Sequence, residues 1–307
     1  MDLIIKKNSV NFFYQSVFWV AVILAQNTTA VAEVAKPAPA EAAEESTIDL
    51  TNQPRPKLEI AMGGGEFYLT DYPGANESHY HFLPLPFVVY RGEHIKANRQ
   101  DGWRGLFFNS ETYDVDLSMD AAFPTHAGEN SARAGMSDLD WMFEIGPRFV
   151  FHVHKGAMAK VDAVLAARAV FSTDGSRLDA RGYDLNPYLR LRHRLLYAEP
   201  SFIQATFAGI WATSNLTRYF YDVPAEFATA NRPQFRAKEG FMNSYFTLAL
   251  VHALPRDFSI FAGLVKSYYA DSVNRSSPLM KAIETEDYFV GLAWKVYESS
   301  EKTLSKD

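Results

Sequence analysis

The feature that most constrains the fold is an alternation of apolar and polar residues that continues for unusually long stretches. Between Leu139 and Val153 the odd positions are almost all apolar, and the charged residues fall on even positions. A period of two indicates a β-strand with one apolar and one polar face. Strands in globular proteins average about 5–6 residues, whereas a strand that crosses a bilayer at a tilt needs about 9–11. The stretch is long enough to cross a membrane.

The same pattern returns in other segments, most clearly at 113–121, 157–171 and 183–197. A soluble β-sandwich also has alternating strands, but they are shorter and their polar faces meet water. Repeated long strands with one lipid-like face favour a transmembrane barrel. We therefore predict an all-β fold, a closed antiparallel transmembrane β-barrel.

Eleven strands are clear from the pattern, and long connections alternate with tight ones between most of them. A single-chain bacterial barrel has an even number of strands, which keeps both chain ends on one side of the membrane. We therefore add a twelfth strand at Glu93–Asn98, where the hydrophobic signal is weak. The eleven clear strands are 58–68, 80–90, 103–109, 113–121, 138–153, 157–171, 183–197, 201–213, 240–254, 258–270 and 286–297.

The segments outside the barrel have different compositions. Lys6 and Lys7 precede a short apolar run, and Ala30-Val31-Ala32 is typical of a signal-peptidase site. The run is too short for a membrane anchor, because a spanning helix needs about 20 apolar residues. Residues 33–57 are rich in Ala, Pro and Glu and have no aromatic residue, which is typical of a disordered chain. The predicted organisation is a signal peptide at 1–32, a disordered periplasmic tether at 33–57, the barrel at 58–297 and a C-terminal tail at 298–307.

Composition argues against several classes of function. The chain has no cysteine, so it has no disulfide, thiolate metal site or cysteine nucleophile. A net charge of −6 without a basic run argues against nucleic-acid binding. His126 lies near Ser131 in sequence, but proximity alone does not make a catalytic pair. We predict a protein that is not an enzyme, with no cofactor and no metal site.

Charged residues on the inward positions form the most distinctive group of the predicted barrel. Two interpretations remain open. If the charges pair, they form a network that fills the lumen; if acidic and basic rows stay apart, they create a field that orients a passing polar solute. The group comprises Arg190, Arg192, Arg194, Arg168, Lys160, Asp114, Asp116, Asp140, Glu144, Asp162 and Asp184.

Aromatic residues are predicted to gather near the strand ends, as they do at the two interfaces of a membrane barrel. At the periplasmic rim we expect Tyr113, Phe202, Phe258 and Val296, and at the outer rim Trp141, Phe171, Tyr183, Trp211, Tyr268 and Tyr288.

Short motifs spread over most of the chain resemble the MltA-interacting protein (MipA/OmpV) family of Gram-negative outer-membrane proteins. The motifs include Asp71-Tyr72-Pro73-Gly74, Pro84-Leu85-Pro86, Glu144-Ile145-Gly146-Pro147, Tyr219-Phe220-Tyr221-Asp222-Val223 and Gly291-Leu292-Ala293-Trp294-Lys295. The resemblance implies an outer-membrane barrel and, for one branch, a scaffold that links a murein hydrolase to a peptidoglycan synthase. Other branches are associated with solute passage or adhesion.

Three functions follow as hypotheses. The first is a scaffold in the outer membrane, surrounded by its lipid and with both termini in the periplasm. Because its periplasmic turns are short, a murein hydrolase or synthase would have to bind the tether or the tail. The second is a narrow channel for small polar solutes. The third is an adhesin that uses an exposed outer-loop patch made of Tyr219, Phe220 and Tyr221. The sequence leaves open a second arrangement, in which this cluster folds back over the barrel mouth.

Overall fold

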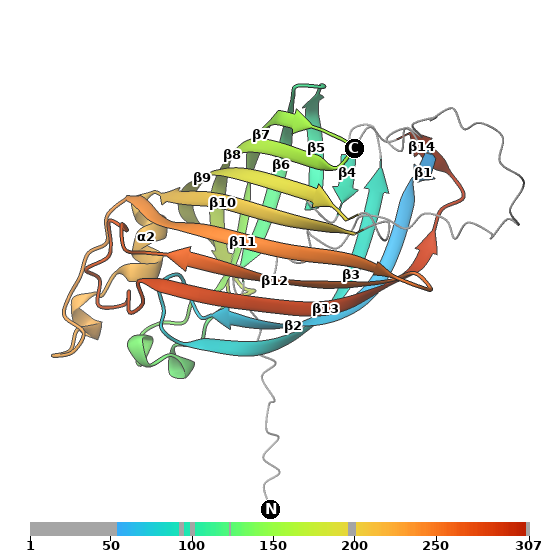
Figure 1. The fold of residues 1–307 in the computed structure, drawn as a ribbon. Helices are drawn as coiled ribbons and strands as arrows, with labels where there is room; N and C mark the ends of the chain where they lie inside the picture. The colour runs from blue at the N-terminus through green and yellow to red at the C-terminus, as the bar shows by residue number, and fades with distance from the viewer. Residues whose placement is uncertain (1–53, 92–94, 99–101, 123, 196–200, 305–307) are drawn as a thin grey trace, which may run out of the picture.

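The protein is described by a computed structural model that covers residues 54–91, 95–98, 102–122, 124–195 and 201–304. Twelve antiparallel strands form the body of the molecule (Figure 1). They are β2 (Leu58–Thr70), β3 (Ser78–Arg91), β4 (Ile95–Asn98), β5 (Gly102–Asn109), β6 (Tyr113–Ala122), β7 (Trp141–Lys155), β8 (Ala159–Thr173), β9 (Leu178–Arg194), β10 (Phe202–Ala212), β11 (Gly240–Leu254), β12 (Phe258–Tyr268) and β13 (Glu284–Glu298).

Each of these strands pairs with two neighbours. Strands that follow one another in the chain are paired throughout, and β13 returns to pair with β2, so the ladder of pairing closes on itself. The predicted all-β class and the count of twelve strands are confirmed. The weak twelfth strand is β4, which joins β3 to β5.

Strand ends differ from the predicted bounds by a few residues in most cases. The largest difference is in β9, which begins at Leu178 rather than at 183. Asp179 and Arg181 made this segment resemble a polar loop, yet it pairs with the end of β8 after a shift of register next to Val170. Charged residues can continue the strand here because this end of β9 projects beyond the exposed apolar side chains that surround the barrel.

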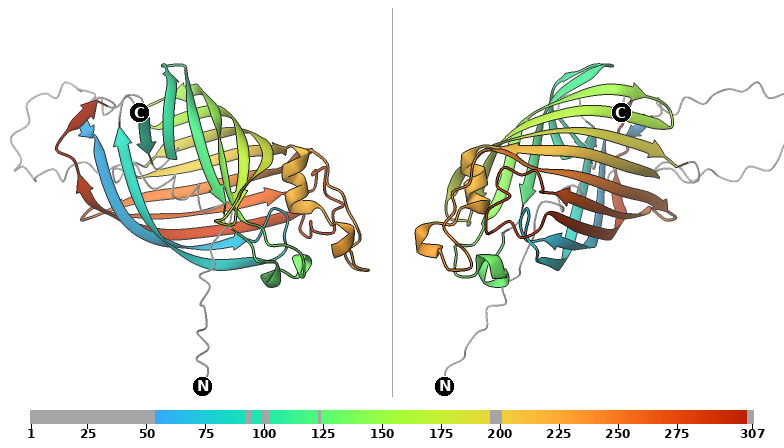
Figure 2. Two further views of the ribbon diagram at one scale, coloured as in Figure 1. Left: turned by 180° about the vertical axis from the view of Figure 1, so that it is seen from behind. Right: turned by 60° about the vertical axis from the view of Figure 1, so that its left-hand side comes forward.

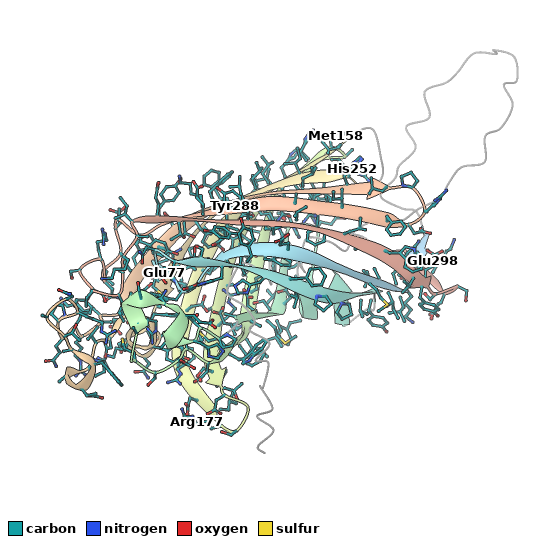
Figure 3. The ribbon with its side chains drawn as sticks, turned by 90° about the horizontal axis from the view of Figure 1, so that it is seen from below. Glu77, Met158, Arg177, His252, Tyr288 and Glu298 are labelled. Carbon is teal, nitrogen blue, oxygen red and sulfur yellow. The ribbon has the colours of Figure 1, made fainter. Side chains whose placement is uncertain are left out.

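The two ends of the barrel differ in their connections (Figure 2). One end, which we call the loop end, carries the long connections with the helix α2 (Ser214–Tyr221) and the short helices η2 (Ala127–Glu129), η3 (Ser131–Arg133) and η4 (Ala225–Phe227). The other, the turn end, carries the tight connections. Figure 3 shows Glu77 and Arg177 at the loop end and Met158, His252 and Glu298 at the turn end. No helix among the described residues is long and apolar enough to cross a membrane.

A second, two-stranded sheet lies at the turn end and joins the two ends of the described chain. β1 (Pro54–Pro56) pairs with β14 (Lys302–Leu304), and Lys57 Nζ lies 2.8 Å from the Glu301 carboxylate. We call this sheet the clasp. Residues 54–57 of the expected disordered tether are therefore paired, and the strand that pairs with them lies in the expected tail. Residues 1–32 and most of the tether lie outside the described residues.

The barrel wall is least paired along one edge of β3. β4 pairs only with Tyr90 and Arg91, so within the described part of the chain no strand covers this edge from Ser78 to Val89. Pro84 and Pro86 have no N–H, and both are register partners of β2. They can occupy those positions only as non-hydrogen-bonded pairs, so their nitrogens face the uncovered edge. At Pro84 and Pro86 this edge therefore has no backbone N–H to donate to a neighbouring strand.

Candidate functional site: the lumen and its cap

The alternation in the sequence assigns the two faces of each strand. On β7 to β9 the odd-numbered residues point outward, and Phe149, Leu165 and Leu189 are 42%, 45% and 56% exposed. The even-numbered residues point into the lumen and are mostly buried. An apolar surface of this kind around a whole barrel is far larger than the patches on soluble monomers. It matches a surface that contacts lipid.

Opposite charges in the lumen are placed directly across from one another by the strand register. Asp116 on β6 is the register partner of Arg148 on β7, and the carboxylate accepts two hydrogen bonds from the guanidinium, both 3.0 Å. Both side chains are buried. This forked geometry is the strongest form of Arg–carboxylate pairing. Arg148 was not in the predicted group, although its even position in the alternation places it there.

A second charged layer lies nearer the turn end. Arg190 donates to Asp162 over 2.9 Å and 3.2 Å. His152 lies with Nδ1 2.8 Å from Asp162 and Nε2 3.3 Å from Asp114. His152 therefore bridges an aspartate on β6 and an aspartate on β8, a role that the sequence pattern did not assign to it.

Arg168 is the centre of a third layer near the loop end. Its guanidinium lies 3.1 Å from carboxylate oxygens of Asp120, Glu144 and Asp184. Three carboxylates therefore share one cation in a place where water is largely excluded. At the rim beyond this layer, Arg181 lies 3.5 Å from Asp140 and 3.1 Å from Asp179.

The remaining predicted charges lie toward the turn end. Arg192 donates to the side-chain oxygen of Gln204 over 2.9 Å and is the register partner of Lys160. Lys160, Arg192 and Arg194 are half-buried. Of the two interpretations, the structure supports pairing in the layers around Arg148, Arg168 and Arg190, whereas Lys160, Arg192 and Arg194 form a basic group toward the turn end.

The opposite wall of the lumen is apolar. β2, β11, β12 and β13 point Phe67, Tyr245, Phe261 and Phe289 inward, and all four are buried. The Phe261 ring fits because Gly291 faces it, and a Cβ at that position would overlap the ring. The lumen thus has one ion-paired wall and one aromatic wall. Phe202 also belongs to this inner cluster, so its predicted place in the outward aromatic rim was wrong.

The loop end is closed by a layer of side chains that we call the cap. α2 supplies Leu216, Phe220 and Tyr221, which are buried among residues of the other loops and of the strand ends. The contributing loop residues are Tyr72, Leu139, Val223, Tyr269, Leu279 and Met280. The cap is also hydrogen-bonded, since Tyr72 donates to the Leu279 carbonyl over 2.7 Å and Ser277 to the Tyr221 carbonyl over 2.8 Å.

The cap corrects the predicted outer-loop patch. Phe220 and Tyr221 are 1% and 0% exposed, and the Tyr219 hydroxyl contacts the backbone N–H of Asp140 over 2.5 Å. The sequence allowed two places for this aromatic run, an exposed patch for adhesion or a position over the barrel mouth. These rings cover the barrel mouth, because an amphipathic helix places them on the face that meets the lumen.

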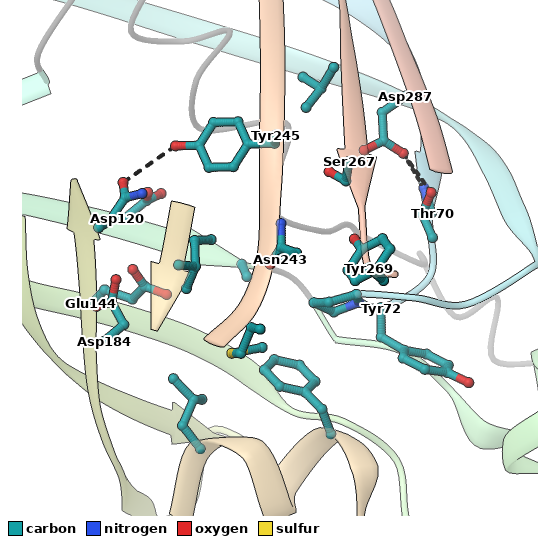
Figure 4. Close-up of a pocket in the computed structure, with 18 of the residues that line it drawn as sticks. Thr70, Tyr72, Asp120, Glu144, Asp184, Asn243, Tyr245, Ser267, Tyr269 and Asp287 are labelled. Atoms are coloured by element: carbon teal, nitrogen blue, oxygen red, sulfur yellow. Dashed lines mark hydrogen bonds between the residues drawn. The ribbon is translucent and has the colours of Figure 1, made fainter. Parts of the chain in front are cut away.

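A cavity of about 70 Å³ remains beneath the cap (Figure 4). Asp120, Glu144 and Asp184 lie on one side of it, and the pair formed by Thr70 and Asp287 lies on the other. At about 10–15 Å³ for each water, it has room for about five water molecules. The space is far smaller than the continuous channel of an open porin.

The structure offers little support for catalysis at the histidines. His126 Nδ1 lies 2.9 Å from Asp138, whereas Ser131 donates its hydroxyl hydrogen to Glu77. The two candidate partners therefore bind different carboxylates. Within the described residues no group of three or more His, Asp or Glu side chains is arranged to hold a metal ion.

Comparison with known proteins places this barrel in a family. Residues 62–296 match the family described as MltA-interacting protein MipA. The chain belongs to the MipA family. The match covers all twelve barrel strands in whole or in part and confirms the resemblance seen in the motifs.

Solved structures of similar shape are remote from the MipA-family chain. An outer membrane channel from Pseudomonas putida F1 is 10% identical, with a TM-score of 0.43 over 82% of this chain and 100% of that one. The NanC porin is 8% identical, with a TM-score of 0.37 over 77% and 100%. The CymD monoaromatic hydrocarbon channel is 9% identical, with a TM-score of 0.36 over 79% and 90%. These likenesses are too remote to bear on function. No curated protein matches the sequence.

Proposed function

We propose that the barrel lies in the outer membrane with its loop end outside the cell and its turn end in the periplasm. The exposed apolar belt supports contact with lipid, and exposed rings lie near both ends, as in membrane barrels. Tyr183 and Trp211 near the loop end are 63% and 42% exposed, and Trp294 near the turn end is 49% exposed. In this orientation the clasp, which joins the two ends of the described chain, lies on the periplasmic side.

Within that membrane we propose a scaffold without catalytic activity or conductance, as a protein of the MipA family. The observation that carries this proposal is the cap, because a lumen closed by buried side chains leaves no continuous path for ions. The paired charges below it further support a filled interior. A barrel of this kind serves as a fixed support in the membrane.

A planar-bilayer recording tests the closed lumen. We expect the wild-type protein to be electrically silent and Phe220→Ser, which removes a buried ring of the cap, to show discrete conductance steps. Phe207→Ser is the matched control, because Phe207 is 62% exposed on the outward face and should leave the protein silent. Conductance steps in the wild type would instead favour the second candidate, a narrow channel for small polar solutes, which the charged wall and the cavity support.

We propose that the partner is a murein hydrolase of the MltA type and that it binds the clasp. The turn at Pro255-Arg256-Asp257 illustrates how little surface the turn end offers, since a stable interface needs about 800 Å² on each partner. The clasp combines both ends of the described chain into one surface. Deleting residues 300–307 should therefore abolish capture of the hydrolase from a periplasmic extract while the barrel remains folded.

The matched control deletes residues 33–45 of the tether and leaves the clasp strands in place. This variant should still capture the hydrolase. Capture that survives loss of the clasp strand but not loss of residues 33–45 would show that the tether alone holds the partner.

A further inference from the structure

A second cavity, separate from the lumen, lies on the outer surface of the loop end. It is an open groove of about 840 Å³ between three segments: the loop after η3, the β8–β9 connection, and α2 with η4. Pockets that bind small molecules usually have about 300–1,000 Å³. The groove is therefore large enough for a ligand of one or two sugar rings. Four arginines and four aspartates line it: Arg133, Arg177, Arg181, Arg218, Asp138, Asp140, Asp179 and Asp222.

Three of the four arginines have structural partners. Arg133 donates to the carbonyl oxygens of Phe220 and Ser137, each over 3.1 Å, and so holds the cap in place. Arg181 pairs with Asp179 and stacks on the Tyr219 ring, 4.1 Å from its centre. Arg177 lies 3.5 Å from both Asp174 and Asp179.

Arg218 on α2 is different. Its Nε, like that of Arg133, is buried without a hydrogen-bond partner in the described chain, but the Arg218 guanidinium also forms no ion pair and no other hydrogen bond with the described residues. Asp222, four residues later, accepts the backbone N–H of Ala237 over 2.6 Å with one carboxylate oxygen and forms no ion pair with Arg218. A half-buried guanidinium without an anionic partner is costly. An anion supplied by a ligand would satisfy it.

The rest of the groove determines what accompanies that anion. Asn215 is exposed, lies one turn before Arg218 on α2 and also lines the groove, so its amide can donate to the same group. Asp222 uses one carboxylate oxygen for a backbone N–H group, and its other oxygen can accept a bond from a hydroxyl group. Met136 and Phe227 add apolar contact. These neighbours suit a polyhydroxylated ring, and the aspartates disfavour a polyanion.

We propose that this groove binds an anionic sugar, with Arg218 holding its phosphate or carboxylate group. The site is independent of the clasp and of the closed lumen, so it holds whether or not the scaffold proposal does. The sugar could be free in the medium or the head of a glycolipid in the surrounding membrane, and the chemistry of recognition is the same.

Calorimetric titration of the purified full chain in a non-ionic detergent tests the site. Glucose 1-phosphate and glucuronate should bind, and glucose should bind at least about tenfold more weakly, because the charge-assisted contact is missing. Arg218→Gln should lower affinity for the two anions by about tenfold or more. Asn215→Asp, at an exposed position, should also weaken binding by placing a negative charge beside Arg218.

Arg236→Gln is the matched control, because Arg236 is exposed at the same end of the barrel but does not line the groove. It should leave affinity within about twofold of wild type, as distant surface charges are screened. Equal losses in Arg218→Gln and Arg236→Gln, equal binding of glucose and its phosphate, or no binding of either anion at millimolar concentration would overturn the proposal. Thermal unfolding of each variant shows that the fold is retained.

A second arm distinguishes the two sources of the ligand. The titration with glucose 1-phosphate is repeated in nanodiscs made of phosphatidylcholine, with and without a phosphorylated glycolipid. A loss of affinity only with the glycolipid identifies a membrane lipid as the occupant. Unchanged affinity identifies a free sugar.

Discussion

At the scale of single residues, the sequence predicted which charges enter the lumen but not how they pair. Parity alone determines the face of a strand, so the inward positions of Asp162, Arg168 and Arg190 followed from the alternation. Their partners depend on register, which a single sequence does not reveal. The alternation also placed Arg148 and His152 inward, but their partners Asp116, Asp114 and Asp162 appear only when β6, β7 and β8 are aligned.

Arg168 offers the sharpest test of this network. Arg168→Met should lower the free energy of unfolding by about 3–5 kcal/mol, because Asp120, Glu144 and Asp184 would be left buried without a cation. Urea titration in detergent measures the change. Arg177→Met, at a side chain 66% exposed, should stay within about 0.5 kcal/mol of wild type. Adding Glu144→Gln to Arg168→Met should restore part of the loss, and a failure to do so would argue against the network.

Asp71, in the loop after β2, gives a prediction about pH. Burial raises the pKa of its carboxyl above the ordinary 3.8, although hydrogen bonds from Asn130 and His79 oppose the change. Above pH 3.8 the folded chain keeps a proton that the unfolded chain has lost, so this group's contribution to stability falls as pH rises through the raised pKa. Comparing the pH dependence of unfolding in wild type and Asp71→Asn should isolate that fall.

A second variant checks the cause. The negative charge of Glu77 adds to the raised pKa of Asp71, so Glu77→Gln should bring that pKa closer to 3.8. Carboxyl carbon shifts in an NMR titration report it directly. A pKa of Asp71 at or below 3.8 in the wild type would contradict the burial argument.

At the scale of elements, long alternating strands were predictable and the cap was not. The exposed apolar belt imposes the same alternation on the long strands that cross it. The weak β4 was inferred separately, from the rule that such a barrel has an even number of strands. α2 is different, because eight residues in a loop do not reveal which side they cover. The sequence therefore allowed Phe220 and Tyr221 either on the surface or over the barrel mouth, and only the structure shows that the mouth is where they are buried.

The uncovered edge of β3 predicts an alternating pattern of hydrogen exchange. Since Pro84 and Pro86 face this edge, the other even-numbered amides do so too, and Tyr80 and Phe82 should exchange fast. The amides of His81 and Leu83 face β2 and should be protected. β8, which is paired on both sides, should show no such alternation. Equal protection of neighbouring residues in β3 would mean that another strand covers the edge.

At the scale of the whole molecule, the clasp pairs the two ends of the described chain with each other. Arg55 and Thr303 are register partners in β1 and β14, and paired Cα atoms of antiparallel strands lie about 4.5–5.5 Å apart, within the range of a disulfide. Because the chain has no cysteine, Arg55→Cys with Thr303→Cys creates the one possible bond. We expect it to form on mild oxidation and to change gel mobility in denaturant.

The single-cysteine variants are the controls for that experiment, since neither can close a ring within one chain. A mobility change in the double variant that reducing agent does not reverse would not count as the expected bond. No intramolecular bond under oxidising conditions would show that β1 and β14 do not stay paired in solution.

Because the clasp holds residues 54–56 against residues 302–304, the described part of the chain is almost a ring, and the barrel within it could begin at any strand. If a short peptide linker replaced the clasp and joined β13 to β2, new termini could be placed at any of the tight hairpins at the turn end, such as the one between β11 and β12. Such circular permutants should assemble the same barrel. The fold would then not depend on which strand comes first in the chain.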